Sequence, residues 1–216
     1  MNTRTNHLGG WRLFSLLAVS ILAMAALILA FAPDSVEGTR SVIRATARTS
    51  FALFFTAFTA SAFAVLVPSP FSRSLLRERR IIGLSFAFSH FVHAIAIFAY
   101  GQLAPEFWPN RTALGNLPGS IGYAFILLLT LTSFKGPARL LGAKAWKRLH
   151  VTGMWVIAAI FTYSYFKRIP TNLLYAIPFG IVVAAVAVRL VGKLALAARR
   201  NQRAPANPDE RKALVS

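Results

Sequence analysis

The sequence predicts an all-α integral membrane protein, a single bundle of six transmembrane helices with both termini in the cytoplasm. The chain has 216 residues, of which 56% are hydrophobic and only 14% are charged. The hydrophobic residues gather in stretches of about 15–20 residues that are apolar on all sides, and most of these stretches are long enough to cross ~30 Å of hydrocarbon. A soluble helical chain would show amphipathic stripes instead.

The distribution of basic residues predicts the topology. The chain has 24 Lys and Arg residues against six Asp and Glu. With a cytoplasmic N-terminus, the inner segments hold 18 of the 24 basic residues and the outer loops hold the other six. This bias follows the positive-inside rule. Topology and anionic lipid headgroups therefore account for the net charge of +18, and no nucleic-acid partner is expected.

The first three spans are each bounded by polar or proline residues. The first follows Arg12; a cleavable signal peptide is the alternative, but its apolar run of about 20 residues exceeds the usual signal core. Pro68 and Pro70 end the second span, because proline cannot continue a helix. Arg79 and Arg80 precede the third. These spans are expected at 13–31, 51–67 and 81–100.

The last three spans are separated by an irregular outer loop and a basic inner segment. The loop 101–119 contains three prolines and three glycines, so no helix is expected there. Pro178 falls inside the sixth span, where it predicts a packing kink. The spans are expected at 120–134, 149–166 and 173–187. Residues 1–197 then form one transmembrane domain, and the charged tail 198–216 is expected to be disordered.

Two absences narrow the chemistry. The chain has no cysteine, which excludes disulfides, iron–sulfur clusters, thiolate-ligated haem and covalently attached haem. All six acidic residues lie in the expected loops or tail. Proton- and sodium-coupled transporters usually place an acid within the bundle, so a transporter is disfavoured.

His90 and His93 are the only ionisable side chains in the third apolar run. An ionisable residue at membrane depth is costly and usually functional, and neutral imidazole is a common ligand for metals and haem iron. His93 lies thirteen residues beyond Arg80, a rise of about 20 Å. The alternatives are an interhelical hydrogen bond for His93 and a packing role for His90.

The fifth span contributes two further candidates. His150 follows the basic segment 135–148 and stands at the inner interface, where a merely polar interfacial role is the alternative. Tyr163 lies thirteen residues further along the same helix, near the expected depth of His93.

Three groups of residues carry a resemblance to a known family. Arg79-Arg80-Ile-Ile-Gly83-Leu84 is followed by His93, Leu131-Thr132-Ser133 is followed by Arg139-Leu-Leu-Gly142, and Trp146-Lys-Arg-Leu-His150 opens the fifth span. Over roughly residues 40–170 these motifs resemble the ferric reductase-like transmembrane family. Within it, they are most similar to the haem-binding membrane subunits of the bacterial methionine sulfoxide reductase system.

The resemblance implies a bundle in the bacterial inner membrane that carries b-type haem between its third and fifth spans. His93 matches the ligand of the third helix and His150 matches the first histidine of the fifth, so these two are the expected iron ligands. Relatives usually have a second histidine where Tyr163 stands. Three arrangements stay open: Tyr163 is an axial ligand, His90 or His93 holds a five-coordinate haem, or haem has been lost. With haem present, His150 contacts a propionate, a quinone or a second haem.

The leading hypothesis is therefore a haem b electron conduit, a membrane component of a ferric reductase-like oxidoreductase. Electrons would come from a cytoplasmic reductase or from quinol, with flavin supplied by a partner, and leave to a periplasmic acceptor protein or ferric iron. The basic segment 135–148 is a candidate docking face for the reductase. The alternative is a haem-free accessory or assembly subunit of the same fold.

Overall fold

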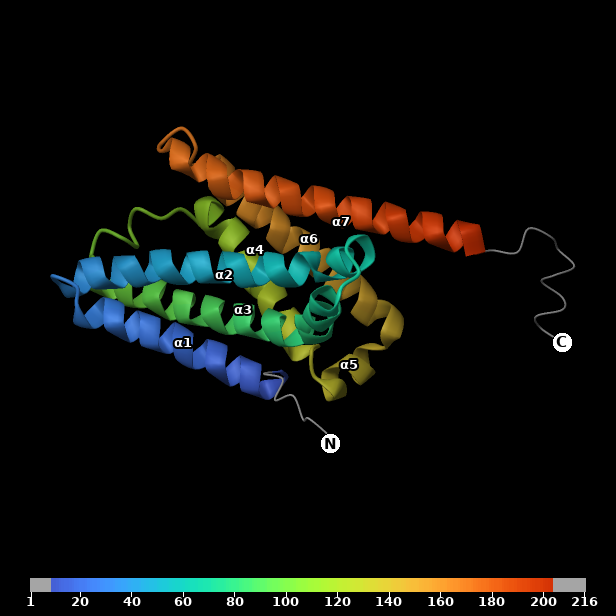
Figure 1. Cartoon of the computed structure of the whole chain (residues 1–216). Helices are drawn as coiled ribbons and strands as arrows, with labels where there is room; N and C mark the ends of the chain where they lie inside the picture. The colour runs from blue at the N-terminus through green and yellow to red at the C-terminus, as the bar shows by residue number, and fades with distance from the viewer. Residues whose placement is uncertain (1–8, 204–216) are drawn as a thin grey trace, which may run out of the picture.

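A computed structural model describes residues 9–203; His7 and residues 204–216 of the tail lie outside the described residues. Within the described range the chain is helical without strands, and six helices are long and apolar enough to cross a membrane, as predicted. Figure 1 shows the long helices running side by side in alternating directions. The elements are α1 (Trp11–Ala30), α2 (Ser35–Leu66), α3 (Pro70–Leu103), α4 (Ala113–Leu131), α5 (Lys135–Leu141), α6 (Ala143–Phe166), the 3-10 turn η1 (Leu173–Tyr175) and α7 (Ala176–Arg203).

Both ends of the described chain lie at the same end of the bundle (Figure 1). This end, here called the basic end, holds the start of α1, the α2–α3 connection, α5 and the last turns of α7. The α1–α2, α3–α4 and α6–α7 connections lie at the opposite end. The segments at and next to this end contain Arg12, Arg73, Arg77, Arg79, Arg80, Lys135, Arg139, Lys144, Lys147, Arg148, Lys193, Arg199 and Arg200.

The helices extend well beyond the predicted spans. α2 begins at Ser35 rather than at 51, because the Asp34 side chain accepts a hydrogen bond from the Glu37 amide (2.8 Å) and caps the helix. Glu37 then pairs with Arg40 and Arg44 along the first turns. At the other terminus, α7 continues through Arg203, so residues 198–203 are helical where disorder was expected. Charged helical ends of this kind can stand in water outside the hydrocarbon.

Helix also extends into the loop 101–119, which was expected to be irregular, and into the basic segment 135–148. Between α3 and α4, only residues 104–112 are not helical. The Thr112 side chain caps α4 by accepting a hydrogen bond from the Gly115 amide (3.1 Å). Pro118 lies inside α4 near its start. The basic segment 135–148 forms α5 and the first turn of α6, and Gly142 separates the two helices with φ +76°, a conformation that glycine adopts readily.

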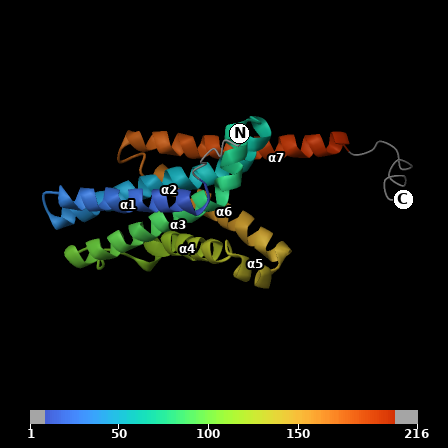
Figure 2. The same cartoon turned by 60° about the horizontal axis from the view of Figure 1, so that its bottom comes forward.

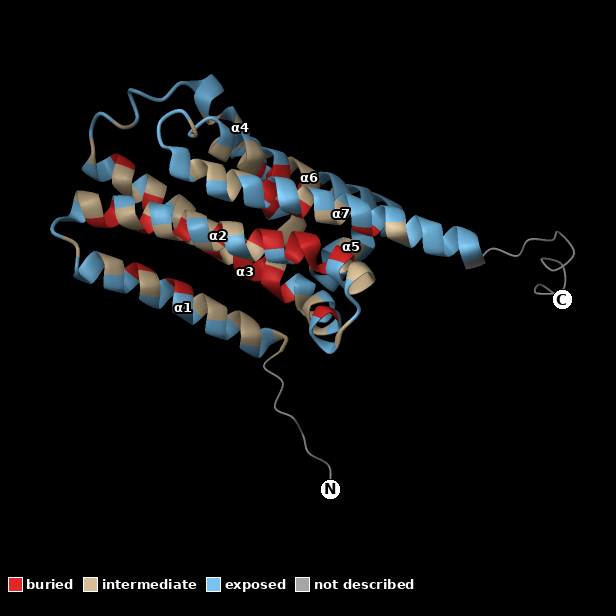
Figure 3. Ribbon diagram, turned by 45° about the horizontal axis from the view of Figure 1, so that its top comes forward, coloured by how far each residue is buried: buried red, intermediate tan, exposed pale blue. Residues whose placement is uncertain are grey.

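The core of the bundle is built around α2. It packs along α3 and α7, α1 covers α2 and α3, and α4 pairs with α6 (Figure 2). Buried residues concentrate on α2 and α3 (Figure 3). α3 and α6 are not in close backbone contact; aromatic side chains span the space between them. Phe161 of α6 lies 5.5 Å from Phe54 and 6.5 Å from Phe86, measured between ring centroids. Such pairs each contribute about 0.5–1.5 kcal/mol beyond their buried area.

Candidate functional site

His93 is held by α2. Its Nδ1 lies 3.1 Å from the Ile43 carbonyl oxygen and 3.1 Å from the Thr46 hydroxyl. A carbonyl oxygen can only accept, so Nδ1 carries the proton and Nε2 keeps its lone pair. Metal-ligating histidines typically have this arrangement, with the second ring nitrogen donating to a carbonyl or carboxylate. The hydrogen bond thus leaves Nε2 as the nitrogen of His93 that could bind a metal.

A buried set of hydroxyl groups fixes this part of the α2–α3 interface. Ser50 donates to the Ser89 hydroxyl (2.9 Å), and Ser89 donates to the Thr46 carbonyl oxygen (3.3 Å). All three residues are fully buried. Sequence reasoning missed them, although the i, i+4 spacing of Thr46 with Ser50 and of Ser89 with His93 marks two polar stripes that can face each other. Polar groups of this kind hold membrane helices together.

His90 contacts different neighbours. Its ring lies 5.0 Å from Tyr123 of α4, 5.2 Å from His93 and 5.4 Å from Phe86, between ring centroids. The Tyr123 hydroxyl donates to the His90 carbonyl oxygen (3.3 Å). The Nδ1 atom of His90 is buried and has no hydrogen-bond partner among the described residues. His90 therefore presents an unused ring nitrogen inside the bundle.

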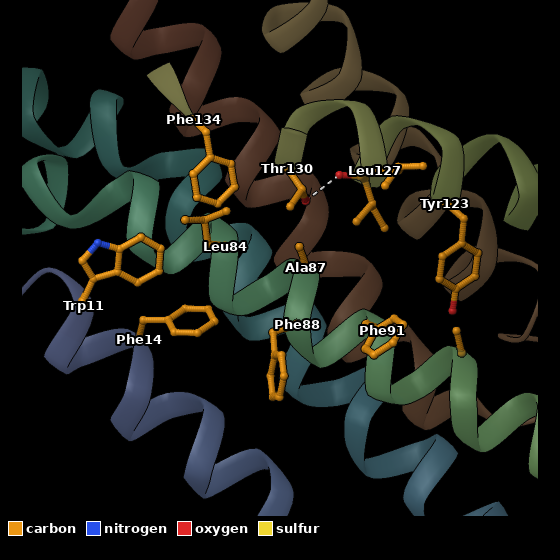
Figure 4. A pocket seen from close by; sticks show the side chains of 12 residues that line it. Trp11, Phe14, Leu84, Ala87, Phe88, Phe91, Tyr123, Leu127, Thr130 and Phe134 are labelled. Carbon is orange, nitrogen blue, oxygen red and sulfur yellow. Dashed lines mark hydrogen bonds between the residues drawn. The ribbon is translucent and has the colours of Figure 1, made fainter. Parts of the chain in front are cut away.

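Tyr123 also borders a cavity of about 450 Å³ between α1, α3 and α4 (Figure 4). This volume falls in the range of small-molecule sites, and the walls are almost entirely apolar. Neither His90 nor His93 lines it. The lining residues are Trp11, Phe14, Leu84, Ala87, Phe88, Phe91, Ala94, Tyr123, Ile126, Leu127, Thr130 and Phe134.

Tyr163 does not occupy the position opposite the histidines. Its side chain is 52% exposed, and the ammonium group of Lys167 lies 5.1 Å from its ring centroid. The α6 residue that faces His90 is Phe161, at 6.4 Å between ring centroids. Two residues turn a helix by about 200°, so side chains at 161 and 163 leave α6 in nearly opposite directions. The depth estimate from the sequence did not include this rotation.

His150 forms a compact cluster with two other residues of the sequence motifs. Its Nε2 lies 3.0 Å from the Thr132 hydroxyl, its ring lies 4.3 Å from that of Trp146, and the Trp146 indole donates to the Thr132 carbonyl oxygen (2.8 Å). The Thr132 hydroxyl donates its proton to the Leu128 carbonyl oxygen (2.6 Å), so it accepts a hydrogen bond from His150 Nε2. The other ring nitrogen of His150, Nδ1, then keeps a lone pair. The cluster ties the end of α4 to the start of α6.

A second cavity, of about 530 Å³, lies beside His150 at the basic end. Arg189 of α7, two residues beyond the predicted sixth span 173–187, forms part of its wall. Its guanidinium lies 4.2 Å from the Phe58 ring centroid and donates to the Phe58 carbonyl oxygen. The lining residues are Ala57, Arg79, Arg80, Gly83, Leu129, Thr130, Ser133, Trp146, Lys147, His150, Val151, Met154 and Arg189.

The side chains present suit an iron porphyrin better than a bare metal ion. Within residues 9–203, no group of three or more His, Cys, Asp or Glu side chains lies close enough to hold a metal ion. A porphyrin supplies four ligands itself and needs only axial ligands from the protein. His93, with its proton fixed on Nδ1, fits that requirement.

Comparison with known families and proteins gives one match. Residues 43–161, more than half of the chain, match the sequence model of the family described as ferric reductase like transmembrane component. The matched segment runs from α2 into α6 and includes His90, His93 and His150. No curated protein and no solved structure matches the chain.

Proposed function

The chain belongs to the ferric reductase-like transmembrane family, and we propose that it is a haem b protein that carries electrons across the membrane. Family membership indicates a transmembrane electron-transfer component with redox partners. The proposal adds the cofactor and its ligand. It is supported above all by the hydrogen bond between His93 Nδ1 and the Ile43 carbonyl oxygen, which leaves Nε2 available to iron.

His93 would hold the iron, and the surrounding residues would orient it. Bound haem supplies a one-electron carrier, since its iron alternates between the ferric and ferrous states. Ile43 and Thr46 keep the imidazole in one tautomer and one rotation. The aromatic residues between α3 and α6 keep water from this depth of the bundle.

The other candidate residues take different places in the proposal. His90 is the second imidazole at the same depth, and its unpartnered Nδ1 makes it the alternative ligand. His150 faces the cavity at the basic end, where a propionate, a quinone or a second haem would meet it. Tyr163 would require a rotation of α6 to reach the iron, so an open sixth position or another ligand is favoured over a tyrosinate.

The partners follow from the charge of the two ends. We infer that the basic end is cytoplasmic, in a bacterial inner membrane, and that α5 with the start of α6 docks an acidic reductase. Quinol is the alternative donor, and flavin would come with the reductase. The acceptor, a periplasmic protein or ferric iron, would then meet the opposite end, as the resemblance to the methionine sulfoxide reductase system suggests.

A dithionite-reduced minus oxidised spectrum of the purified protein tests the proposal. We expect a Soret band and a reduced α band of b-type haem. Both should be lost in His93→Ala and kept in His90→Phe, which removes the neighbouring imidazole from the same helix. If His90→Phe loses the bands and His93→Ala keeps them, the ligand is His90. A colourless protein after expression with ample haem contradicts the proposal.

One observation favours the haem-free alternative. Phe161, Phe86 and Tyr123 pack around His90, and neither His90 nor His93 lines the cavity of Figure 4, the cavity at the basic end or three further cavities of the described chain. A bundle packed in this way suits an accessory or assembly subunit that has kept the fold. The same spectrum decides between the two functions.

A further inference from the structure

Four cationic side chains from three helices line the cavity at the basic end. Arg79 and Arg80 come from α3, Lys147 from α6 and Arg189 from α7. No acidic residue lines this cavity. The described chain thus directs four positive charges toward a space of about 530 Å³.

None of these four cations forms an ion pair with an acidic residue of the described chain. None of the three ion pairs within residues 9–203 includes any of the four side chains. Glu78 is the one acid of the described residues at this end, and it is engaged by Arg77 (3.6 Å) and by the Gly10 amide (2.8 Å). Arg189 Nε is buried without a hydrogen-bond partner. Arg79, Arg80 and Lys147 are exposed and Arg189 is half-buried, so an anion that enters the cavity can pair with cations that have no acidic partner there.

Part of the remaining wall is apolar, and the cavity at the basic end adjoins the apolar cavity between α1, α3 and α4. Ala57, Gly83, Leu129 and Met154 form the apolar wall. Thr130 lines both this cavity and the cavity of Figure 4. A second contact connects the two cavities. The guanidinium of Arg80, which lines the cavity at the basic end, lies 5.7 Å from the ring centroid of Phe134, which lines the cavity of Figure 4. A phosphate among the cations would therefore have an apolar surface beside it.

We propose that this cavity is a binding site for an anionic phospholipid. The phosphate lies among Arg79, Arg80, Lys147 and Arg189, and an acyl chain follows the apolar cavity between α1, α3 and α4. Guanidinium groups bind phosphate through paired, charge-assisted hydrogen bonds. Basic pockets between transmembrane helices on the cytoplasmic side are typical of anionic lipid sites. The lipid and the propionate, quinone or second haem named above for His150 are alternative occupants of this cavity, and the lipid site requires no haem elsewhere in the bundle.

Lipid retention on the full-length protein tests the site. The protein is purified in mild detergent, delipidated, exposed to equal amounts of phosphatidylglycerol and phosphatidylcholine, and examined by native mass spectrometry. We expect preferential retention of phosphatidylglycerol. Arg189→Gln should lower this retention about tenfold, because the variant removes a charge and its hydrogen bonds to the phosphate. Arg73→Gln, at the same end but outside the cavity, should leave retention unchanged.

A second variant fills the cavity without removing a charge. A Cβ built on Gly83 meets no atom within 4 Å, so Gly83→Leu adds volume to the cavity wall without a backbone clash. We expect it to lower phosphatidylglycerol retention while the melting temperature of the delipidated protein stays unchanged. Unchanged retention in both Gly83→Leu and Arg189→Gln overturns the proposal.

Two controls separate other sources of the anion. Inorganic phosphate or glycerol phosphate at millimolar concentration should not displace the retained lipid; displacement would show a site for a soluble phosphate compound and overturn the lipid assignment. Equal retention of phosphatidylcholine would also overturn it. The haem spectrum of Arg189→Gln, where haem is present, should match that of the unmodified protein. Loss of the Soret band in this variant would assign the cavity to a cofactor instead.

Discussion

His90 and His93 lie three residues apart on α3, yet they contact different helices. His93 is hydrogen-bonded to α2, whereas His90 packs against Tyr123 of α4 and faces Phe161 of α6. The direction of each side chain therefore decides which residues can share one cofactor. Position 161 of α6, rather than position 163, therefore faces the α3 histidines, because Phe161 is the α6 side chain directed toward α3.

The first prediction concerns position 161 and depends on the haem proposal. Phe161→His places an imidazole on the face of α6 that points to His90, so we expect a shift toward a low-spin, bis-imidazole spectrum. Tyr163→His is the matched control, since that side chain leaves α6 on the exposed side, and it should leave the spectrum unchanged. Tyr163→Phe should be equally silent. A low-spin spectrum from Tyr163→His alone would contradict the orientation of α6.

The second prediction concerns the support of His93. Thr46→Val keeps the shape of the side chain but removes one of the two acceptors of Nδ1. We expect the free energy of unfolding in detergent to fall by about 0.6 kcal/mol, and by no more than about 1.7 kcal/mol, the range measured for hydrogen bonds between membrane helices. Thr56→Val is the control, because Thr56 is exposed on the same helix and bonds only its own backbone at Ala52. Equal losses in both variants would contradict a specific role for Thr46.

The histidines of this site could be predicted from the sequence. A histidine in an uncharged apolar run is visible without a structure, and so is the spacing of Trp146 and His150. The contacts of Thr132 with His150 and Trp146 were not predictable, because α5 folds between Thr132 and α6 and brings the two motifs together. Arg189 was missed for a related reason: α7 extends past the predicted span and carries this side chain alongside Phe58.

At the scale of whole elements, close approach between helices depends on small residues. A Cβ added to Gly192 of α7 would lie 2.6 Å from the Ala62 Cβ and 2.8 Å from the Ala62 Cα, so the two backbones are in near contact there. Small residues at such crossings allow the packing that holds membrane helices together. The span boundaries were the least predictable feature at this scale, because charged helical ends such as 35–50 have no apolar signal to mark them.

The third prediction tests this α2–α7 crossing. Gly192→Val forces the helices apart, and we expect it to lower the free energy of unfolding by about 1–3 kcal/mol, the usual cost of overpacking. Gly180→Val lies on the same helix, where an added Cβ meets no atom within 4 Å, and should have little effect. Denaturant titration in detergent micelles measures both. Similar losses in the two variants would show that helix propensity, rather than the contact with Ala62, sets the cost.

At the scale of the whole molecule, the alternation of helices and the charge of the two ends together predict how the bundle sits in the membrane. Six helices place both described termini at the basic end, so the orientation of one connection fixes that of all the others. The positive-inside rule favours the cytoplasmic basic end proposed above. This orientation determines which end meets the electron donor and which leaflet supplies the proposed lipid, so an error here would reverse both proposals.

The fourth prediction tests that orientation directly. The chain has no cysteine, so single substitutions give unambiguous labelling sites. Gly136→Cys lies at α5 on the basic end, and Asn110→Cys lies in the connection between α3 and α4 at the other end; both positions are exposed. A membrane-impermeant maleimide applied to intact spheroplasts should label Asn110→Cys at least about tenfold more than Gly136→Cys, and permeabilisation should make the two equal, because the excess of basic residues at one end orients the whole bundle. Labelling of Gly136→Cys in intact spheroplasts would place the basic end outside, and the donor would then have to approach from the opposite face.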